Sequence, residues 1–133
     1  MIEKIDHIGI IVKDLKKATK LFNAYIGLDQ EEIEYIDELK LKISFFEVEG
    51  IDIELIESLD PSILKERFSL DYSNAGVHHI AFRTEKLEMM LEKLKKQGVK
   101  TLQENPVKGA RDSKIIFLDT VDTSGFNIEL VER

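Results

Sequence analysis

The feature that most constrains this 133-residue chain is an internal repeat. Residues 5–10, Ile-Asp-His-Ile-Gly-Ile, and residues 77–82, Val-His-His-Ile-Ala-Phe, are short apolar segments with a histidine at the third position. Apolar and β-branched segments of this kind favour β-strands. Because a repeated unit decides the whole fold, the two copies have to be explained before any single motif.

A helical pattern follows each histidine segment. Asp14 is the N-cap candidate for a helix that ends at Gly27, and Thr84 is the candidate for a helix that ends at Gly98. Apolar residues recur at helical spacing in both segments: Leu15, Ala18, Leu21, Phe22 and Tyr25 in the first, and Leu87, Met90, Leu91 and Leu94 in the second. Both copies are therefore predicted to continue from a strand into a helix.

Both copies then end in β-type sequence. Residues 41–48 and 51–56 flank a hairpin turn at Gly50, and residues 114–118 and 126–131 flank a turn that contains Gly125. The copies end in nearly identical closing segments, Ile-Glu-Leu-Ile-Glu at residues 53–57 and Ile-Glu-Leu-Val-Glu at residues 128–132. The sequence thus predicts two strand–helix–strands units, each opening on His and closing on Glu.

The two copies are expected to form one domain over residues 1–133, with modules at about 4–58 and 77–132. Neither half alone has enough apolar surface for a two-sided core. The connection, residues 59–76, begins with Asp60 and Pro61, which predict a short helix through their roles as cap and first helical residue. Residues 69–76 are expected to form a polar linker.

Composition limits the function classes. The chain has no cysteine, which excludes disulfides, thiolate metal sites and cysteine nucleophiles. Its formal net charge of −7 argues against nucleic acid or an anionic membrane as partner, because phosphate binding needs a basic face. No apolar run approaches the roughly 20 residues that cross a bilayer, and residues 1–7 lack the pattern of a secretory signal. A cytoplasmic location is expected.

The repeated polar side chains, His7, Glu54, His79 and Glu129, are candidate metal ligands. Taken singly, a strand histidine is more often a hydrogen-bonded core residue, and a glutamate in Ile-Glu-Leu more often faces solvent. Duplication changes this, because it would bring two His-plus-Glu pairs together. Two imidazoles and two carboxylates suit one divalent ion such as Co, Mn, Ni, Zn or Fe, with water in open positions.

His78, the neighbour of His79, is expected to be structural or to lie at the rim of the site. Side chains alternate along a strand, so the two histidines point to opposite faces. Both therefore cannot face the same metal ion.

The chain resembles the vicinal oxygen chelate (glyoxalase/bleomycin resistance/dioxygenase) superfamily over nearly all of residues 4–132. The resemblance rests on the two histidine segments, the two closing segments, and the segments at 12–15 and 114–118. It implies an α+β fold of paired βαβββ modules that form an open, curved eight-stranded sheet around a divalent metal. The metal ligands of the superfamily fall on His7, Glu54, His79 and Glu129.

Within the superfamily the chain is most similar to the methylmalonyl-CoA epimerases, through Gly-Val-His-His-Ile at residues 76–80. That similarity implies inversion at the carbon α to a thioester, which interconverts the (R) and (S) epimers of this acyl-CoA. A metal would stabilise the enolate, while one carboxylate removes the α-proton and an acid on the other face returns one.

Glu129 is implied as one of these two proton-transfer groups. Some epimerases carry the second glutamate at a position that is Ile43 here, which cannot carry a proton. Glu54 is the preferred second group and Glu47 the less favoured one. The basic residues are candidates for binding the CoA tail, against a default of ordinary surface charge: Lys13, Lys108, Arg111 and Lys114.

Two other functions stay open. Residues 119–121, Asp-Thr-Val, replace the His-Pro-Lys that epimerases often carry, and Asn-Pro-Val-Lys-Gly at 105–109 resembles glyoxalase I as much as the epimerases. A glyoxalase I that isomerises a hemithioacetal is therefore the first alternative, and a metal-free drug-binding resistance protein is the second. A homodimer is expected, because the sheet edges need cover and the superfamily commonly pairs modules across subunits.

Overall fold

The computed structural model describes all 133 residues and contains eight β-strands and three α-helices. The chain divides into two compact units, an N-terminal unit of residues 7–78 and a C-terminal unit of residues 1–6 and 79–133. Each unit holds one of the two repeated His-plus-Glu copies. None of the three helices is long and apolar enough to cross a membrane.

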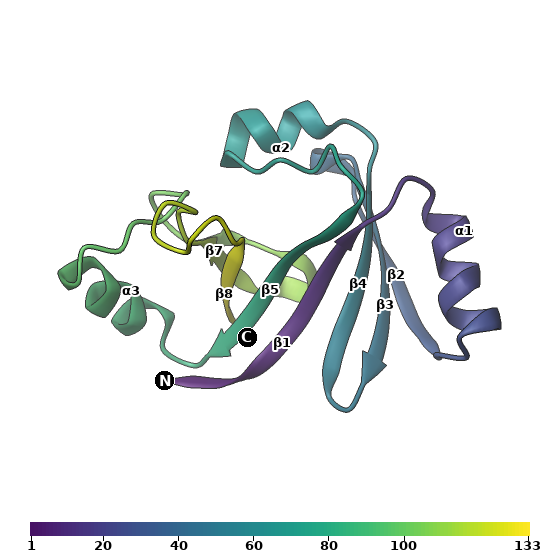
Figure 1. Cartoon of the computed structure of the whole chain (residues 1–133), viewed down its shortest axis with the longest axis horizontal. Coiled ribbons are helices and arrows are strands. Elements are labelled where there is room, and N and C mark those ends of the chain that lie inside the picture. The colour runs from purple at the N-terminus through teal and green to yellow at the C-terminus, as the bar shows by residue number, and fades with distance from the viewer. The chain divides into compact units, whose positions relative to one another are not determined.

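The strands of the N-terminal unit lie in the order β2-β3-β4-β1, with α1 beside them (Figure 1). Their bounds are β1 Ile2–Ile11, β2 Gln30–Ile36, β3 Leu41–Val48 and β4 Ile51–Ser58. The predicted hairpin at Gly50 is confirmed, since β3 and β4 are antiparallel. Glu49 (φ 52°) and Gly50 (φ 79°) both have positive φ, as in the type I′ turns that match strand twist.

Helix α1, Leu15–Lys20, begins where Asp14 predicts it, and the Asp14 carboxylate accepts a hydrogen bond from the Lys17 N–H at 3.1 Å. A π-helical turn, Leu21–Tyr25, continues it towards Gly27. The i→i+5 bond from the Ile26 N–H to the Leu21 carbonyl breaks the 3.6-residue repeat. Tyr25 consequently leaves the predicted apolar face and is 70% exposed.

The core of the N-terminal unit lies between α1 and one face of its strands. Leu15 packs there against Phe46 and Leu55. The short helix predicted after Asp60 is confirmed as α2, Pro61–Phe68, with Asp60 as its side-chain cap. The linker at residues 69–76 is less polar than expected, because Leu70 and Tyr72 within it are buried.

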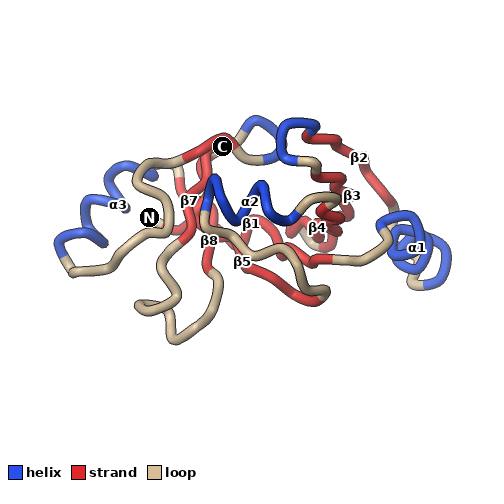
Figure 2. Tube along the Cα trace, turned by 90° about the horizontal axis from the view of Figure 1, so that it is seen from above, coloured by secondary structure: helices blue, strands red, loops and turns tan.

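The strands of the C-terminal unit lie in the order β5-β8-β7-β6. Their bounds are β5 Gly76–Thr84, β6 Val107–Lys108, β7 Lys114–Phe117 and β8 Ile128–Glu132, and α3 is Leu87–Lys96. Strand β8 runs parallel to β5 and antiparallel to β7. The loops before β6 and after β7 are longer than those of the N-terminal unit (Figure 2).

Helix α3 covers the core of its unit. Leu87, Ile116 and Leu130 are buried there, and the predicted apolar face of the helix, Met90, Leu91 and Leu94, packs against them. The predicted cap is wrong. The Thr84 hydroxyl accepts a bond from the Lys86 N–H instead, and the helix begins at Leu87, two residues later than a cap at Thr84 would place it.

Both module helices start on a glutamate from the end of a strand. The Leu87 N–H donates to the Glu132 carboxylate at 2.9 Å, and the Leu15 N–H donates to the Glu57 carboxylate at 2.8 Å. A carboxylate at a helix N-terminus satisfies an otherwise unpaired N–H group and interacts favourably with the helix dipole. The last residue of each closing segment therefore anchors the helix of its own copy.

A buried ion cluster ties together distant parts of the C-terminal unit. The Asp6 carboxylate, with a side chain 0% exposed, accepts bonds from Arg83 Nε at 2.7 Å and from Arg133 Nε and Nη2 at 3.0 Å each. Asp6 is in β1, Arg83 in β5, and Arg133 follows β8. Three charge-assisted bonds to one buried carboxylate thus hold residues 1–6 on this unit.

The glutamate caps can be tested by substitution. Glu132→Ala is expected to lower the free energy of unfolding by about 1 kcal/mol, the usual loss for a removed helix cap. Glu132→Gln keeps an acceptor oxygen and should lose clearly less. Urea unfolding of both variants measures this, and an equal loss in the two would show that the hydrogen bond to Leu87 does not stabilise the helix.

Removal of the Asp6 charge tests the ion cluster. Asp6→Asn is expected to lower the free energy of unfolding by about 2–3 kcal/mol, below the loss for fully buried pairs because both arginines keep some solvent contact. Urea unfolding with the exposed Asp29→Asn as a surface control provides the measurement. A loss no larger than that of the control would refute the structural role of the cluster.

Candidate metal centre

The first His–Glu pair is set by the register of β1 and β4. Gly9 lies opposite Glu54, so His7, two residues earlier, shares the face of Glu54. His7 Nδ1 is 3.1 Å from Glu54 Oε2, and both side chains are 5% exposed. The pair is therefore a buried imidazole–carboxylate contact on the face of the strands opposite the α1 core.

The second pair repeats this arrangement in β5 and β8. Ala81 lies opposite Glu129, and His79 is again two residues earlier. His79 Nε2 is 3.4 Å from Glu129 Oε2, with side chains 2% and 4% exposed. The residue opposite each glutamate is small, Gly9 in one copy and Ala81 in the other, which leaves space for the carboxylate to reach the imidazole.

A buried phenylalanine lies opposite each of these glutamates on its antiparallel neighbour. Phe45 of β3 pairs with Glu54, and Phe117 of β7 pairs with Glu129. The Phe117 ring also contacts His79 edge-on, with centroids 5.2 Å apart and an interplanar angle of 81°. The sequence interpretation did not single out these phenylalanines, although both stand in equivalent positions of the repeat.

The chemistry of these groups fits a divalent metal ion. Two ligand atoms about 2.1 Å from one ion, at an angle of about 90–109°, are about 3.0–3.4 Å apart. Both His–Glu distances, 3.1 and 3.4 Å, fall in this range. Imidazole nitrogen and carboxylate oxygen also suit a borderline ion, so each pair can supply two adjacent ligands.

The comparisons with known proteins identify the family. The model for the Glyoxalase/Bleomycin resistance protein/Dioxygenase superfamily matches residues 6–117. The chain belongs to this superfamily. Among curated members, the chain is 34% identical to the uncharacterized protein YqjC of Bacillus subtilis over 129 residues, which cover 97% of this chain and 91% of that protein.

The human mitochondrial methylmalonyl-CoA epimerase is a more distant relative. It is 26% identical over 127 residues, which cover 96% of this chain and 72% of the epimerase. The resemblance to the superfamily that the sequence indicates is therefore confirmed, and methylmalonyl-CoA epimerases are among its relatives.

Solved structures of other proteins share this fold. A hypothetical protein from Bacillus halodurans matches with a TM-score of 0.85 and 29% identity, over 98% of this chain and 94% of that one. The Mycobacterium tuberculosis methylmalonyl-CoA epimerase matches with a TM-score of 0.84 and 28% identity, over 98% and 88% of the two chains. A variant of the Streptomyces coelicolor epimerase in complex with 2-nitronate-propionyl-CoA matches with 0.84 and 26%, over 99% and 95%. The predicted fold class is confirmed.

Of the two candidates for a second proton-transfer group, only Glu54 lies in a buried pair. Glu47 is exposed near the end of β3, where it pairs with Asp52. Ile43, the position that some epimerases fill with a glutamate, is buried and pairs with Ile56. In this member of the superfamily the strand at that position is therefore apolar.

His78 has different surroundings from His79. Its ring contacts Tyr72 edge-on, with centroids 4.4 Å apart. Burial lowers the pKa of the His78 imidazole, against weaker opposing effects of a hydrogen bond with the Asp71 backbone and of the Asp71 charge. The imidazole is thus held mainly in its neutral form against the linker, in agreement with a structural role.

The basic residues predicted for the CoA tail lie at the surface of their units. Lys13 and Lys108 are exposed, and Lys108 Nζ lies 3.5 Å from the exposed Asp112 carboxylate. Arg111 is half-buried in a left-handed backbone conformation (φ 53°). Their role in binding stays a prediction.

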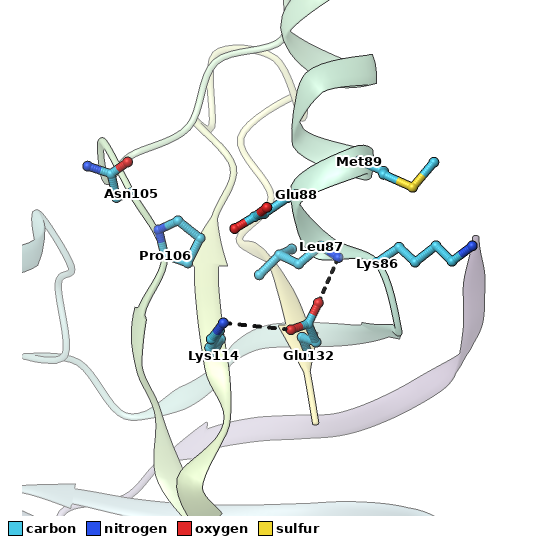
Figure 3. A pocket seen from close by; sticks show the side chains of 8 residues that line it. All are labelled: Lys86, Leu87, Glu88, Met89, Asn105, Pro106, Lys114 and Glu132. Carbon is cyan, nitrogen blue, oxygen red and sulfur yellow. Dashed lines mark hydrogen bonds and ion pairs between the residues drawn. The ribbon is translucent and has the colours of Figure 1, made fainter.

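Lys114, the remaining basic candidate, lines a pocket of about 690 Å³ at the start of α3 (Figure 3). Its ammonium group lies 4.0 Å from the Glu132 carboxylate that also caps α3. Glu132 is three residues beyond Glu129 on β8, so the pocket opens on the other face of the strand from the His79–Glu129 pair.

A second pocket of about 390 Å³ has the same construction at the start of α1, with Lys42 and Glu57 on its wall. Each pocket is lined by two lysines and two acidic residues. The two pockets thus lie at the same place in the two copies, where a module helix docks on its strands, and the charges on their walls balance.

A metal-binding measurement would distinguish the two adjacent histidines. His79→Ala is expected to weaken Co²⁺ binding at least about 100-fold, because a predicted ligand is lost, whereas outer groups typically account for 10- to 100-fold. His78→Ala is the matched control and should bind Co²⁺ as the unmodified protein does. Absorbance titration of metal-free protein measures both, and equal losses would place His78 in the site as well.

The Asp71 turn allows a test of pH dependence. Hydrogen bonds from the Ser73 hydroxyl and then from the Ser73 N–H lower the pKa of the Asp71 carboxyl below its ordinary value of 3.8. The ionised Asp71 carboxylate therefore stabilises the folded protein above pH 3.8, and this contribution is lost as the pH falls through the lowered pKa. Carboxyl-carbon NMR titration should give a pKa below 3.8 that rises in Ser73→Ala. A pKa that Ser73→Ala leaves unchanged would contradict this assignment.

Proposed function

We propose that this chain is a divalent-metal-dependent epimerase that inverts the carbon α to a thioester, with methylmalonyl-CoA as substrate. The observation that carries the proposal is the duplicated buried His–Glu pair, built twice in the same strand register. The methylmalonyl-CoA epimerases among the relatives support the choice of substrate.

We propose His7, Glu54, His79 and Glu129 as the ligands of one divalent metal ion. A buried carboxylate is costly unless a cation or hydrogen bonds compensate it. The ion would supply Lewis-acid stabilisation of the negative charge that develops on the thioester oxygen. Co, Mn, Ni, Zn and Fe all accept this donor set.

The proton transfers are assigned to carboxylates of this chain. Glu129 would remove or return the α-proton on one face of the substrate, and Glu54 would serve the other face. Glu54 is favoured over Glu47 because it is buried, beside His7, and occupies the position that Glu129 holds in the other copy. Phe45 and Phe117 would exclude water from the two carboxylates.

The assignment implies an acyl-CoA partner and a place for its nucleotide-bearing tail. The relative from Streptomyces coelicolor binds 2-nitronate-propionyl-CoA, which supports a CoA thioester as ligand of this chain. Lys13, Lys108, Arg111 and Lys114 remain the candidates for its phosphates. A homodimer also remains a prediction.

Proton exchange at C2 of methylmalonyl-CoA in deuterated water tests the proposal. Metal-stripped protein should be inactive and Co²⁺-reconstituted protein active. Glu129→Gln should reduce exchange about 100- to 10,000-fold, the usual contribution of a general acid–base group. Glu54→Gln should cause a comparable loss, whereas the exposed loop variant Glu104→Gln serves as the control and should exchange normally.

Glyoxalase I activity is the second candidate, favoured by the two equivalent glutamates and the apolar Ile43. Absence of exchange by protein with bound metal would remove the epimerase assignment and leave the metal centre in place. Turnover of the hemithioacetal of methylglyoxal would then establish the glyoxalase reaction.

A further inference from the structure

The hydrogen-bonding ladder on one side of β7 has a gap. Strand β6 pairs only with the start of β7, through Val107 opposite Ile115 and Lys108 opposite Lys114. The ladder resumes where Thr101 bridges Leu118. Residues 102–106 thus span a stretch in which β7 advances by only two residues, 116 and 117, so this segment bulges away from the strand.

The Gln103 side chain closes the gap at Phe117. Its Oε1 accepts a hydrogen bond from the Phe117 N–H at 2.8 Å, and the side chain is buried. The Leu102 N–H donates to the Phe117 carbonyl at 2.9 Å. The Thr101 hydroxyl donates to the Gln103 carbonyl at 2.7 Å, which fixes the bulged segment. Gln103 therefore takes the place of a missing strand carbonyl.

The residue held in this way contacts both members of the His79–Glu129 pair. Phe117 pairs with Glu129 across β7 and β8, and its ring packs edge-on against His79. The N-terminal copy needs no such side chain. There β2 pairs with β3 on the side away from β4, and Glu32 of β2 lies opposite Phe45. Only one of the two copies therefore depends on a glutamine.

We propose that Gln103 is a positioning residue for the His79–Glu129 pair. It acts through Phe117, which lies opposite Glu129 on β8 and whose ring packs edge-on against the His79 imidazole. This inference rests on the proposed metal centre, and it adds a residue outside the repeat to that centre. Outer residues that orient metal ligands typically account for 10- to 100-fold in metal affinity.

The experiment compares Co²⁺ affinity in Gln103→Leu, Gln103→Glu and Thr101→Val. Gln103→Leu removes the acceptor and should weaken binding about 10- to 100-fold. Gln103→Glu keeps an acceptor oxygen and should restore the affinity. Thr101→Val loosens the same loop and leaves the bond to Phe117 intact, so its affinity should equal that of the unmodified protein.

Amide hydrogen exchange of metal-free protein provides a readout independent of the ion. The Phe117 N–H should exchange faster in Gln103→Leu and at the normal rate in Thr101→Val. Normal Co²⁺ affinity in Gln103→Leu, or an equal loss in Thr101→Val, would overturn the positioning role while the metal centre stands. Failure of the unmodified protein to bind Co²⁺ would overturn the metal centre and this inference with it.

Discussion

The register between the first and last strands of each copy is the constraint on which the site depends. Side chains alternate along a strand, so a slip of one residue would move Glu54 to the helix-covered face and away from His7. The same holds for Glu129 and His79. The protein fixes this register twice with the same devices: a small residue opposite the glutamate, a phenylalanine on the next strand, and an apolar core on the other face.

The closing segment of each copy, residues 53–57 or 128–132, supplies both a glutamate of the site and the glutamate that caps the module helix. Its first glutamate faces a histidine, whereas its second, three residues later, faces the opposite side and holds the first N–H of the module helix. Leu130, between the two glutamates of the second copy, belongs to the core beneath α3. One strand thus fixes a buried carboxylate and docks a helix, so an error of register would cost both together.

The repeat made most of the fold and the two His–Glu pairs predictable from sequence, because strand alternation and helical spacing are local patterns. Local patterns of this kind do not predict contacts between residues that are far apart in the sequence. Thr84 was the wrong cap because the true partner, Glu132, lies 45 residues along the chain, although its recurrence at Glu57 was a usable signal. Gln103 lies in a loop whose sequence has no helical or strand periodicity. Its role follows only from the gap in the hydrogen-bonding ladder of β7 beside Phe117.

We propose that the two His–Glu pairs, built alike in separate parts of the chain, bind a single metal ion. X-ray absorption spectroscopy of zinc-loaded protein, combined with metal analysis, tests this most directly. We expect one zinc per chain with two imidazoles and with oxygen atoms as the remaining ligands. Two zinc ions per chain with one imidazole each would show that the pairs act separately, and a chain that takes up no zinc would show that neither pair is a metal site.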